Sequence, residues 1–274
     1  MITVRDIEQF LYDWAPPDTA ESWDNVGLLV GRPDRPVRRV LVALDVTPAV
    51  AAEAAELGAD LIVAHHPVMN VRWHEREMQT LRDDTRLGGL LTCLVRQDLS
   101  VICMHTNLDA AEGGVNDCLA QKLGLSGTIP LNEQKIGRIG TLSCEIPLEQ
   151  FLHDVVKSLS CRGLRYRDGG RPVHRVAVGG GACGEYIPHA LAQGCDTFVT
   201  SDLRYNDFLD TRGLNLIDAG HFPTEDVVCP EVVHRLQKAF PAICVSKSAV
   251  HRDAVQYYIC LLYTSPSPRD RSLS

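Results

Sequence analysis

Histidines in this chain directly follow apolar runs that have the length of β-strands. His65 and His66 come after the run 60–64, and Pro67 marks the end of the expected strand. Because successive side chains of a strand point to opposite faces, two adjacent histidines can address one site only where the chain turns. A pair of solvated loop histidines is the alternative. The carboxyl end of a buried strand is where α/β sheets bind ligands, which favours a functional role.

The next expected strand, 100–104, is followed by His105 and Asp109. An imidazole and a carboxylate are therefore expected at the same edge of the sheet as the first histidine pair. The alternative role for Asp109 is to cap a helix that begins near Gly113.

A third pair, His221 and Glu225, follows the apolar run 214–218. Residues four apart face the same side of a helix, and Pro223 is a suitable residue for a helix start. A capping arrangement built on Thr224 is the alternative.

Neutral imidazoles and carboxylates together are the ligands of Zn, Mn, Fe or Ni sites. The ten cysteines include no CxxC pair, which argues against a structural zinc site made of thiolates. A carboxylate such as Glu225 can bridge two cations. Histidines together with two carboxylates at three strand ends are typical of a two-cation site at the seam between the halves of the chain.

Alternating strand and helix patterns position these residues. Apolar spacing predicts a helix over 4–14, ended by the pair Pro16-Pro17. Further along the chain the pattern predicts strands at 39–45, 60–64 and 100–104, and helices at 49–57 and around 78–87. This alternation is typical of a parallel sheet built from βαβ units.

The second half repeats the first. Strand 175–178, a glycine-rich turn, helix 186–192 and strand 194–200 match 40–64 without a gap, and 214–221 resembles 99–105. We therefore expect an α/β fold with two similar α/β domains from an internal duplication, and a metal site at the strand carboxyl ends between them.

Glycine, polar residues and Pro130 in 126–140 indicate the domain boundary. The expected domains are 1–127 and 128–258. The remaining segment, 259–274, is dominated by Ser, Pro and Arg. It is expected to be disordered, and it resembles appended, non-native sequence.

Composition narrows the function classes. The net charge is −8 and the pI is about 5.7, which argues against a nucleic-acid-binding or membrane-surface protein because both need a basic face. Neither a signal peptide nor an apolar run of membrane-spanning length is evident, and the dilute cysteines fit a reducing compartment. We expect a cytoplasmic protein.

A glycine-rich turn at 179–184 formally satisfies GxGxxG, and Asp202 follows at roughly the distance of a dinucleotide fingerprint. Such a motif more often forms a tight turn that lets a helix pack closely on a strand, so nicotinamide binding is the weaker of the two interpretations. The loop 23–27 combines Trp, Asp, Asn and Gly near the first strand, as a packed turn or as part of a pocket wall.

Taken together, several blocks resemble the Nif-three-like proteins, also called GTP cyclohydrolase I type 2 homologs. The resemblance runs from the first helix to about Tyr258 and rests on Glu21-Ser-Trp-Asp-Asn-Val-Gly-Leu-Leu-Val-Gly31, Leu44-Asp-Val-Thr-Pro48, Ala64-His-His-Pro67, His105-Thr-Asn-Leu-Asp109 and Asp218-Ala-Gly-His-Phe-Pro-Thr-Glu225. It implies two α/β domains, a dinuclear divalent-metal site and a toroidal homohexamer, a trimer of dimers. The family's metal ligands fall on His65, His66, Asp109, His221 and Glu225, with Glu225 as the bridge.

This chain departs from the family at Asn206, where members commonly carry a histidine. The departure removes an imidazole that could transfer a proton at that position and touches no expected ligand.

The resemblance implies a metal-dependent hydrolase that opens a purine ring by attack of a metal-bound hydroxide, with a small-molecule substrate that could be a nucleotide. His105 is the candidate catalytic residue, as an orienter or proton carrier. A metal-dependent phosphoesterase or amidohydrolase would use the same metal core. The rival from another class is a non-catalytic metal-binding scaffold or regulatory interaction protein, since function follows the site rather than the fold.

Overall fold

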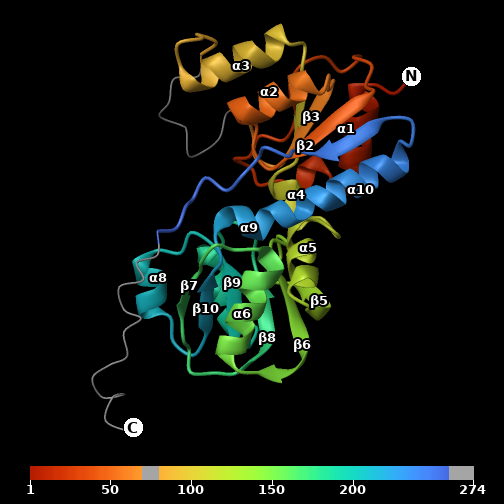
Figure 1. The fold of residues 1–274 in the computed structure, drawn as a ribbon. Helices are drawn as coiled ribbons and strands as arrows, with labels where there is room; N and C mark the ends of the chain where they lie inside the picture. The colour runs from red at the N-terminus through yellow and green to blue at the C-terminus, as the bar shows by residue number, and fades with distance from the viewer. Residues whose placement is uncertain (70–79, 259–274) are drawn as a thin grey trace, which may run out of the picture.

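The computed structural model describes residues 1–69 and 80–258, which form two β-sheets (Figure 1). The first sheet has the order β1-β4-β3-β2-β11 and the second β5-β6-β8-β9-β10-β7. The strands of the first sheet are β1 (Gly27–Val30), β2 (Arg39–Ala43), β3 (Leu61–Ala64), β4 (Ser100–Cys103) and β11 (Cys244–Lys247). Those of the second are β5 (Ser126–Pro130), β6 (Arg138–Ile146), β7 (Arg165–Arg167), β8 (Val173–Val178), β9 (Thr197–Thr200) and β10 (Asn215–Asp218).

Ten α-helices lie in the described residues: α1 (Val4–Trp14), α2 (Pro48–Glu56), α3 (Arg86–Arg96), α4 (Thr106–Ala110), α5 (Val115–Lys122), α6 (Leu148–Leu159), α7 (Ile187–Ala192), α8 (Tyr205–Asp210), α9 (His221–Glu225) and α10 (Cys229–Ala239). Short 3-10 turns form at η1 (Pro17–Thr19), η3 (Gly184–Tyr186) and η4 (Asp226–Val228). Threonine residues cap the first two helices. Thr3 forms a capping box with Asp6, and the Thr47 side chain accepts a hydrogen bond from the Val50 backbone N–H.

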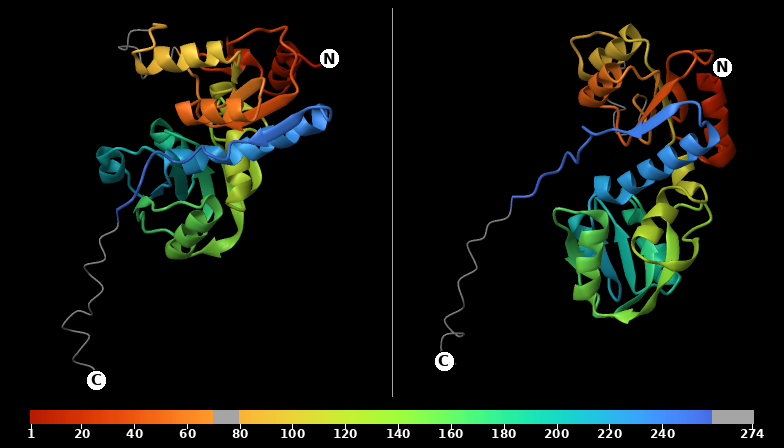
Figure 2. Two further views of the ribbon diagram at one scale, coloured as in Figure 1. Left: turned by 45° about the horizontal axis from the view of Figure 1, so that its top comes forward. Right: turned by 45° about the vertical axis from the view of Figure 1, so that its right-hand side comes forward.

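The two sheets share one arrangement, which supports the expected duplication and confirms the α/β fold class. Strands β2, β3 and β4 are parallel, and so are β8, β9 and β10. An antiparallel strand completes each set, β1 beside β4 and β7 beside β10. The two halves therefore present equivalent strand ends, and Figure 2 shows them as two lobes with α10 running along their boundary.

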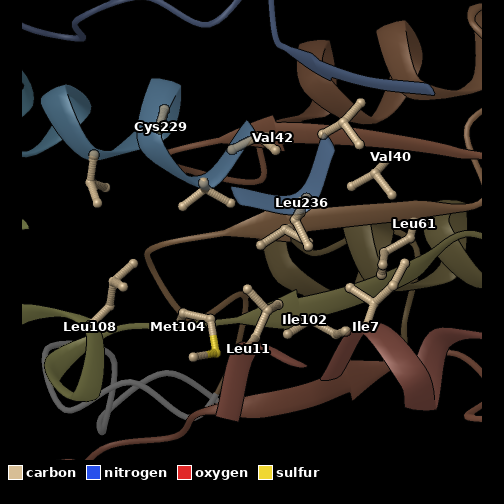
Figure 3. Packing of buried hydrophobic residues seen from close by; sticks show 14 of the residues in the cluster. Ile7, Leu11, Val40, Val42, Leu61, Ile102, Met104, Leu108, Cys229 and Leu236 are labelled. Carbon is tan, nitrogen blue, oxygen red and sulfur yellow. The ribbon is translucent and has the colours of Figure 1, made fainter. Parts of the chain in front are cut away.

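Helices cover both faces of the first sheet, which explains its continuous apolar strands. On one face, α1 and α10 pack against β2, β3 and β4 (Figure 3); this core includes Ile7, Leu11, Val40, Val42, Leu61, Ile102 and Leu236. On the other face, α2 and α3 cover Leu41, Ile62 and Val101. The sheet is held rigidly from both sides, so its strand ends offer fixed positions for side chains.

The segment 126–140, expected to contain the domain boundary, holds β5 and the start of β6, which pair antiparallel in the second sheet. Two features differ from the sequence-based expectations. The expected helix 78–87 is found instead as α3 at Arg86–Arg96, and part of the expected range lies outside the described residues. Residues 80–85 form loops and turns. Apolar spacing alone does not locate a helix start, which Thr85 fixes as N-cap.

The chain also returns to the first sheet at its end. Strand β11 pairs in parallel with β2, although the sequence placed all of 128–258 in a second domain. Strand β11 is too short to show where it pairs from its own pattern, so the return depends on α10 docking on the first sheet. The segment 259–274 lies outside the described residues.

Within the described ranges, no helix has both the length and the apolar character needed to cross a bilayer. The nine cysteines found there all carry free thiols.

Candidate metal centre

The ends of three strands, β3, β4 and β10, bring the predicted residues together. His65 and His66 follow β3, and their backbone N–H groups both donate to the Leu44 carbonyl, at 3.2 and 2.9 Å. This sharp turn lets adjacent side chains address one site. His105 precedes α4 after β4, and Asp109 lies within α4. Asp109 therefore does not cap the following helix, α5, whose N-cap is Gly114.

His221 and Glu225 lie on α9, after β10 of the second sheet. The Nε2 atoms of His66 and His221 are each 3.0 Å from Glu225 Oε2 and 3.3 Å from each other. His65 Nε2 is 3.8 Å from Glu225 Oε1 and 3.8 Å from Asp109 Oδ1. Glu225, from the second half, thus reaches the histidines and the carboxylate of the first half.

All four imidazoles are oriented through Nδ1. The acceptors are the Met104 carbonyl for His65 (2.8 Å), Asp45 for His66 (2.7 Å), Asp24 for His105 (2.8 Å) and Asp202 for His221 (2.6 Å). A hydrogen bond donated by Nδ1–H leaves Nε2 as the ring atom available to a metal ion. Each ring is therefore oriented to ligate a metal ion through Nε2 once that atom carries no proton.

Sequence reasoning missed the orienting roles of Asp24, Asp45 and Asp202. Each lies in a segment that had been singled out, namely the loop 23–27, the block 44–48 and the residues after β9. Their roles were not visible because each carboxylate meets a histidine that is 19 to 81 residues away in the chain.

Unpaired buried atoms show that the cluster fits a cation. His65 Nε2 and Asp109 Oδ1 are buried and have no hydrogen-bond partner. Leaving such atoms unpaired costs roughly 1–3 kcal/mol each. Two groups have ligand atoms within 4.8 Å of one another: His65, His66 and His105, and also His66, His221 and Glu225. A cation bound among them would satisfy the unpaired atoms, and this donor set suits a transition metal.

The pKa values of the clustered side chains also favour a bound cation. Burial lowers the pKa of His66 and of His221, but the Glu225 carboxylate and the hydrogen bonds that the rings donate to Asp45 and Asp202 outweigh it and raise these pKa values to about 10 and about 11. Burial raises the pKa of Glu225, but the two histidines outweigh it and hold that pKa well below its ordinary value. The pKa of Asp109 is raised by its burial. Positive charge is therefore favoured beside Glu225.

The glycine-rich turn at 179–184 serves this cluster. A Cβ on Gly181, whose φ is +66°, would lie 2.0 Å from Glu225 Oε1 and 3.2 Å from His221 Nε2. The Gly181 N–H donates to Thr224 Oγ1 at 3.0 Å. Glycine is thus required because the backbone approaches the Glu225 carboxylate closely. This packing explains the glycine-rich turn without invoking a dinucleotide site.

Asn116 joins the two halves of the cluster. Its side chain is fully buried, donates from Nδ2 to the Asp109 carbonyl at 3.0 Å and accepts at Oδ1 from the Gly180 N–H at 2.9 Å. One amide therefore links the backbone of a first-half carboxylate to the glycine turn that packs against Glu225.

A cavity of about 1130 Å³ opens over the cluster and is lined by residues of both halves. Its wall includes Trp23, which is partly exposed and meets the edge of the His105 ring with 6.0 Å between centroids. Tyr186, Met69, Arg86 and Arg252 also line it. The cavity joins the metal-type cluster to apolar and basic surface.

Fold and site together define a class of protein in which two duplicated α/β halves meet at a histidine and carboxylate cluster that can hold metal. The sequence pattern of the Duf34/NIF3 (NGG1p interacting factor 3) family matches residues 2–253, and the chain belongs to that family. This confirms the resemblance drawn from the sequence blocks.

Individual relatives agree with this assignment. The GTP cyclohydrolase 1 type 2 homolog of Clostridium perfringens is 33% identical over 258 residues, covering 90% of this chain and 97% of the relative. The crystal structure of a Bacillus cereus protein related to NIF3 matches with a TM-score of 0.86 at 25% identity, over 94% of this chain and 99% of that one. A Staphylococcus aureus hypothetical protein matches with a TM-score of 0.85 at 30% identity, over 93% and 99%.

Proposed function

We propose that the chain is a metal-dependent hydrolase whose two divalent cations are held by His65, His66, Asp109, His221 and Glu225. The observation that carries this proposal is the position of Glu225. Its Oε2 faces the Nε2 atoms of His66 and His221 at 3.0 Å, and its Oε1 faces His65 at 3.8 Å. A carboxylate whose two oxygens face different ligand groups is suited to bridge two cations.

When bound, a pair of divalent cations lowers the pKa of water toward neutrality and polarises the bond that is to be broken. The protein's own contribution is to hold the donors and to move a proton. His105 is our candidate proton carrier, because Asp24 fixes its Nδ1 and its ring lies 5.2 Å from that of His65. Burial of Asp109 and Glu225 keeps bulk water away from the donor atoms.

The substrate we propose is a purine nucleotide. The cavity is large enough for a molecule of that size. Trp23 and Tyr186 in its wall support contact with a base, and Arg86 and Arg252 in its wall support contact with phosphates. The name of these relatives, GTP cyclohydrolase 1 type 2 homolog, makes opening of the imidazole ring of GTP the first reaction to test. Phosphoester or amide hydrolysis would use the same donors.

The test is turnover of GTP and of generic phosphoesters by protein reconstituted with Zn²⁺, Mn²⁺, Fe²⁺ or Ni²⁺, compared with His66→Ala and Glu225→Ala. Glu149→Gln, on the exposed side of α6, is the matched control because it removes a carboxylate far from the cluster. We expect turnover by the wild type and the control only. If wild type with two metals bound is as inert as the variants on both substrate groups, the protein is a metal-binding scaffold rather than a hydrolase.

Metal stoichiometry tests the site separately from the reaction. We expect two divalent ions per chain by elemental analysis after reconstitution. A single ion, or none, would refute the two-cation centre.

We further propose that the chain assembles as a homohexamer, a trimer of dimers, as its resemblance to the family implies. Light scattering coupled to gel filtration measures this directly, and a mass of one chain would refute it.

A further inference from the structure

Asp45 connects the cluster to a histidine that neither the sequence blocks nor the ligand groups include. Its Oδ1 lies 2.7 Å from His66 Nδ1, and its Oδ2 lies 3.0 Å from His251 Nε2. Asp45 follows β2, whereas His251 lies beyond β11 and 206 residues further along the chain. Both oxygens of one carboxylate are therefore engaged by imidazoles from opposite ends of the sequence.

The segment that carries His251 is fastened to the first half. Ser248 Oγ donates to the Glu53 carboxylate on α2, and the Ala249 N–H donates to the same carboxylate at 2.7 Å. The His251 N–H in turn donates to Ser248 Oγ at 3.1 Å. These bonds fix the backbone from which the imidazole reaches Asp45.

Packing alone does not explain a histidine at this position. The His251 side chain is 4% exposed, and its ring lies 5.0 Å from that of Phe222, beside the ligand His221. Its Nδ1 is buried and has no hydrogen-bond partner, which is costly for a ring that serves only to fill space. A phenylalanine would fill the same space without that cost. The feature that phenylalanine lacks is the Nε2–H bond to Asp45.

We propose that His251 is a positioning residue that holds Asp45, and through it the ligand His66, in the orientation that binds metal. This inference rests on the proposed metal centre. A carboxylate bonded through one oxygen can rotate, and the ring that it orients can rotate with it. A second bond to the other oxygen fixes the carboxylate plane, and with it the direction of His66 Nε2. The side chain of Asp45 is 42% exposed, so burial alone does not fix its orientation.

The test compares His251→Phe, which keeps the ring and loses the donor, with His251→Gln, which keeps an amide N–H near the position of Nε2. His234→Phe on the exposed face of α10 is the control for a histidine replaced elsewhere. The readouts are apparent Zn²⁺ affinity by competition with a chromogenic chelator, the visible spectrum of the Co²⁺-loaded protein, and the melting temperature without metal. None of them requires turnover.

We expect His251→Phe to lose about ten-fold to a hundred-fold in Zn²⁺ affinity and to change the Co²⁺ spectrum, while its metal-free melting temperature stays within about 4 °C of wild type. His251→Gln should recover most of the affinity, and His234→Phe should match wild type. If His251→Phe binds Zn²⁺ as tightly as wild type, the positioning role is refuted while the metal centre stands. If the Zn²⁺ affinity of His251→Phe falls only as far as its folded fraction falls, and His251→Gln fails to restore it, His251 has a structural role and the inference is wrong. If wild type itself binds no divalent metal, the proposed function fails and this inference fails with it.

Discussion

Replacing Gly181 by alanine perturbs the candidate centre by a single methyl group. The added Cβ would lie 2.0 Å from Glu225 Oε1, whereas ordinary contact begins at 3.4 Å. The turn cannot easily retreat, because the Gly181 carbonyl accepts bonds from Thr200 Oγ1 at 2.9 Å and from the Ser201 N–H at 3.0 Å. The Glu225 carboxylate must therefore move, by about 1.4 Å.

Two costs of this change can be separated. The first is conformational, because φ of +66° at Gly181 costs an alanine roughly 1–2 kcal/mol. The second is a loss of metal affinity, because the carboxylate of Glu225, the proposed ligand, is displaced. Distances in metal sites hold to about 0.2 Å, so a shift several times larger removes Glu225 from its position. We expect a loss of at least about ten-fold in metal affinity, which corresponds to about 1.4 kcal/mol.

Gly194→Ala is the matched control. Gly194 has φ of +70°, and a Cβ there meets nothing within 4 Å, so this variant carries the conformational cost alone. The assays are urea unfolding of the metal-free proteins and Zn²⁺ titration against a competing chelator. Both variants should be destabilised by roughly 1–2 kcal/mol, with an additional loss for Gly181→Ala, and only Gly181→Ala should lose metal affinity.

Equal Zn²⁺ affinities for the two variants, at equal folded fractions, would refute this reasoning. The Glu225 carboxylate would then either not be a ligand or have an alternative position that binds as well.

Three further predictions concern residues around the cluster. Asn116→Ala and Asn107→Ala each remove a fully buried amide, so each should lower the free energy of unfolding in urea by about 1–3 kcal/mol. Only Asn116→Ala should weaken Zn²⁺ binding. Equal Zn²⁺ affinities for the two variants would contradict the linking role of Asn116. Asparagine can adopt the φ of +54° found at Asp202, so Asp202→Asn should leave the stability almost unchanged. It should lower Zn²⁺ affinity about ten-fold to a hundred-fold. Unchanged affinity would refute the role of Asp202 in orienting His221. Because the pKa values of His66 and His221 are about 10 and about 11 without metal, both rings are protonated at pH 7, so Zn²⁺ binding should release protons and tighten as pH rises toward 9. Calorimetry in buffers of different ionisation enthalpy measures the release, and no release would show that these rings are not protonated before Zn²⁺ binds.

Much of the candidate site could be predicted because its residues stand directly beside strands with strong local patterns. Apolar runs such as 60–64 locate a buried strand whatever its neighbours are, and the residue after the run lies at the carboxyl edge of the sheet. His65 and His105 could be assigned to one edge on that ground alone. The four-residue spacing of His221 and Glu225 placed both on one helical face in the same way.

Less could be predicted where the local pattern is weak. Segment 126–140 contains glycine and proline, yet it forms strand β5 and the start of β6 because its partners in the second sheet supply the hydrogen bonds. Strand β11 is short, and its pairing with β2 depends on α10 packing across the first sheet. Pairing between distant strands is a property of the assembled core rather than of either segment.

The sequence by itself determined the α/β alternation, the repeat of its two halves and the set of residues able to bind metal, because periodicity and residue type act over a few neighbours. Only the tertiary structure decided which carboxylate orients which imidazole, how closely the Gly181 backbone approaches Glu225, and that His251 reaches Asp45 from the far end of the chain. These contacts join segments whose separation in the sequence is unrelated to their distance in space. They depend on how two packed halves dock, and docking is the sum of many weak contacts that no single segment encodes.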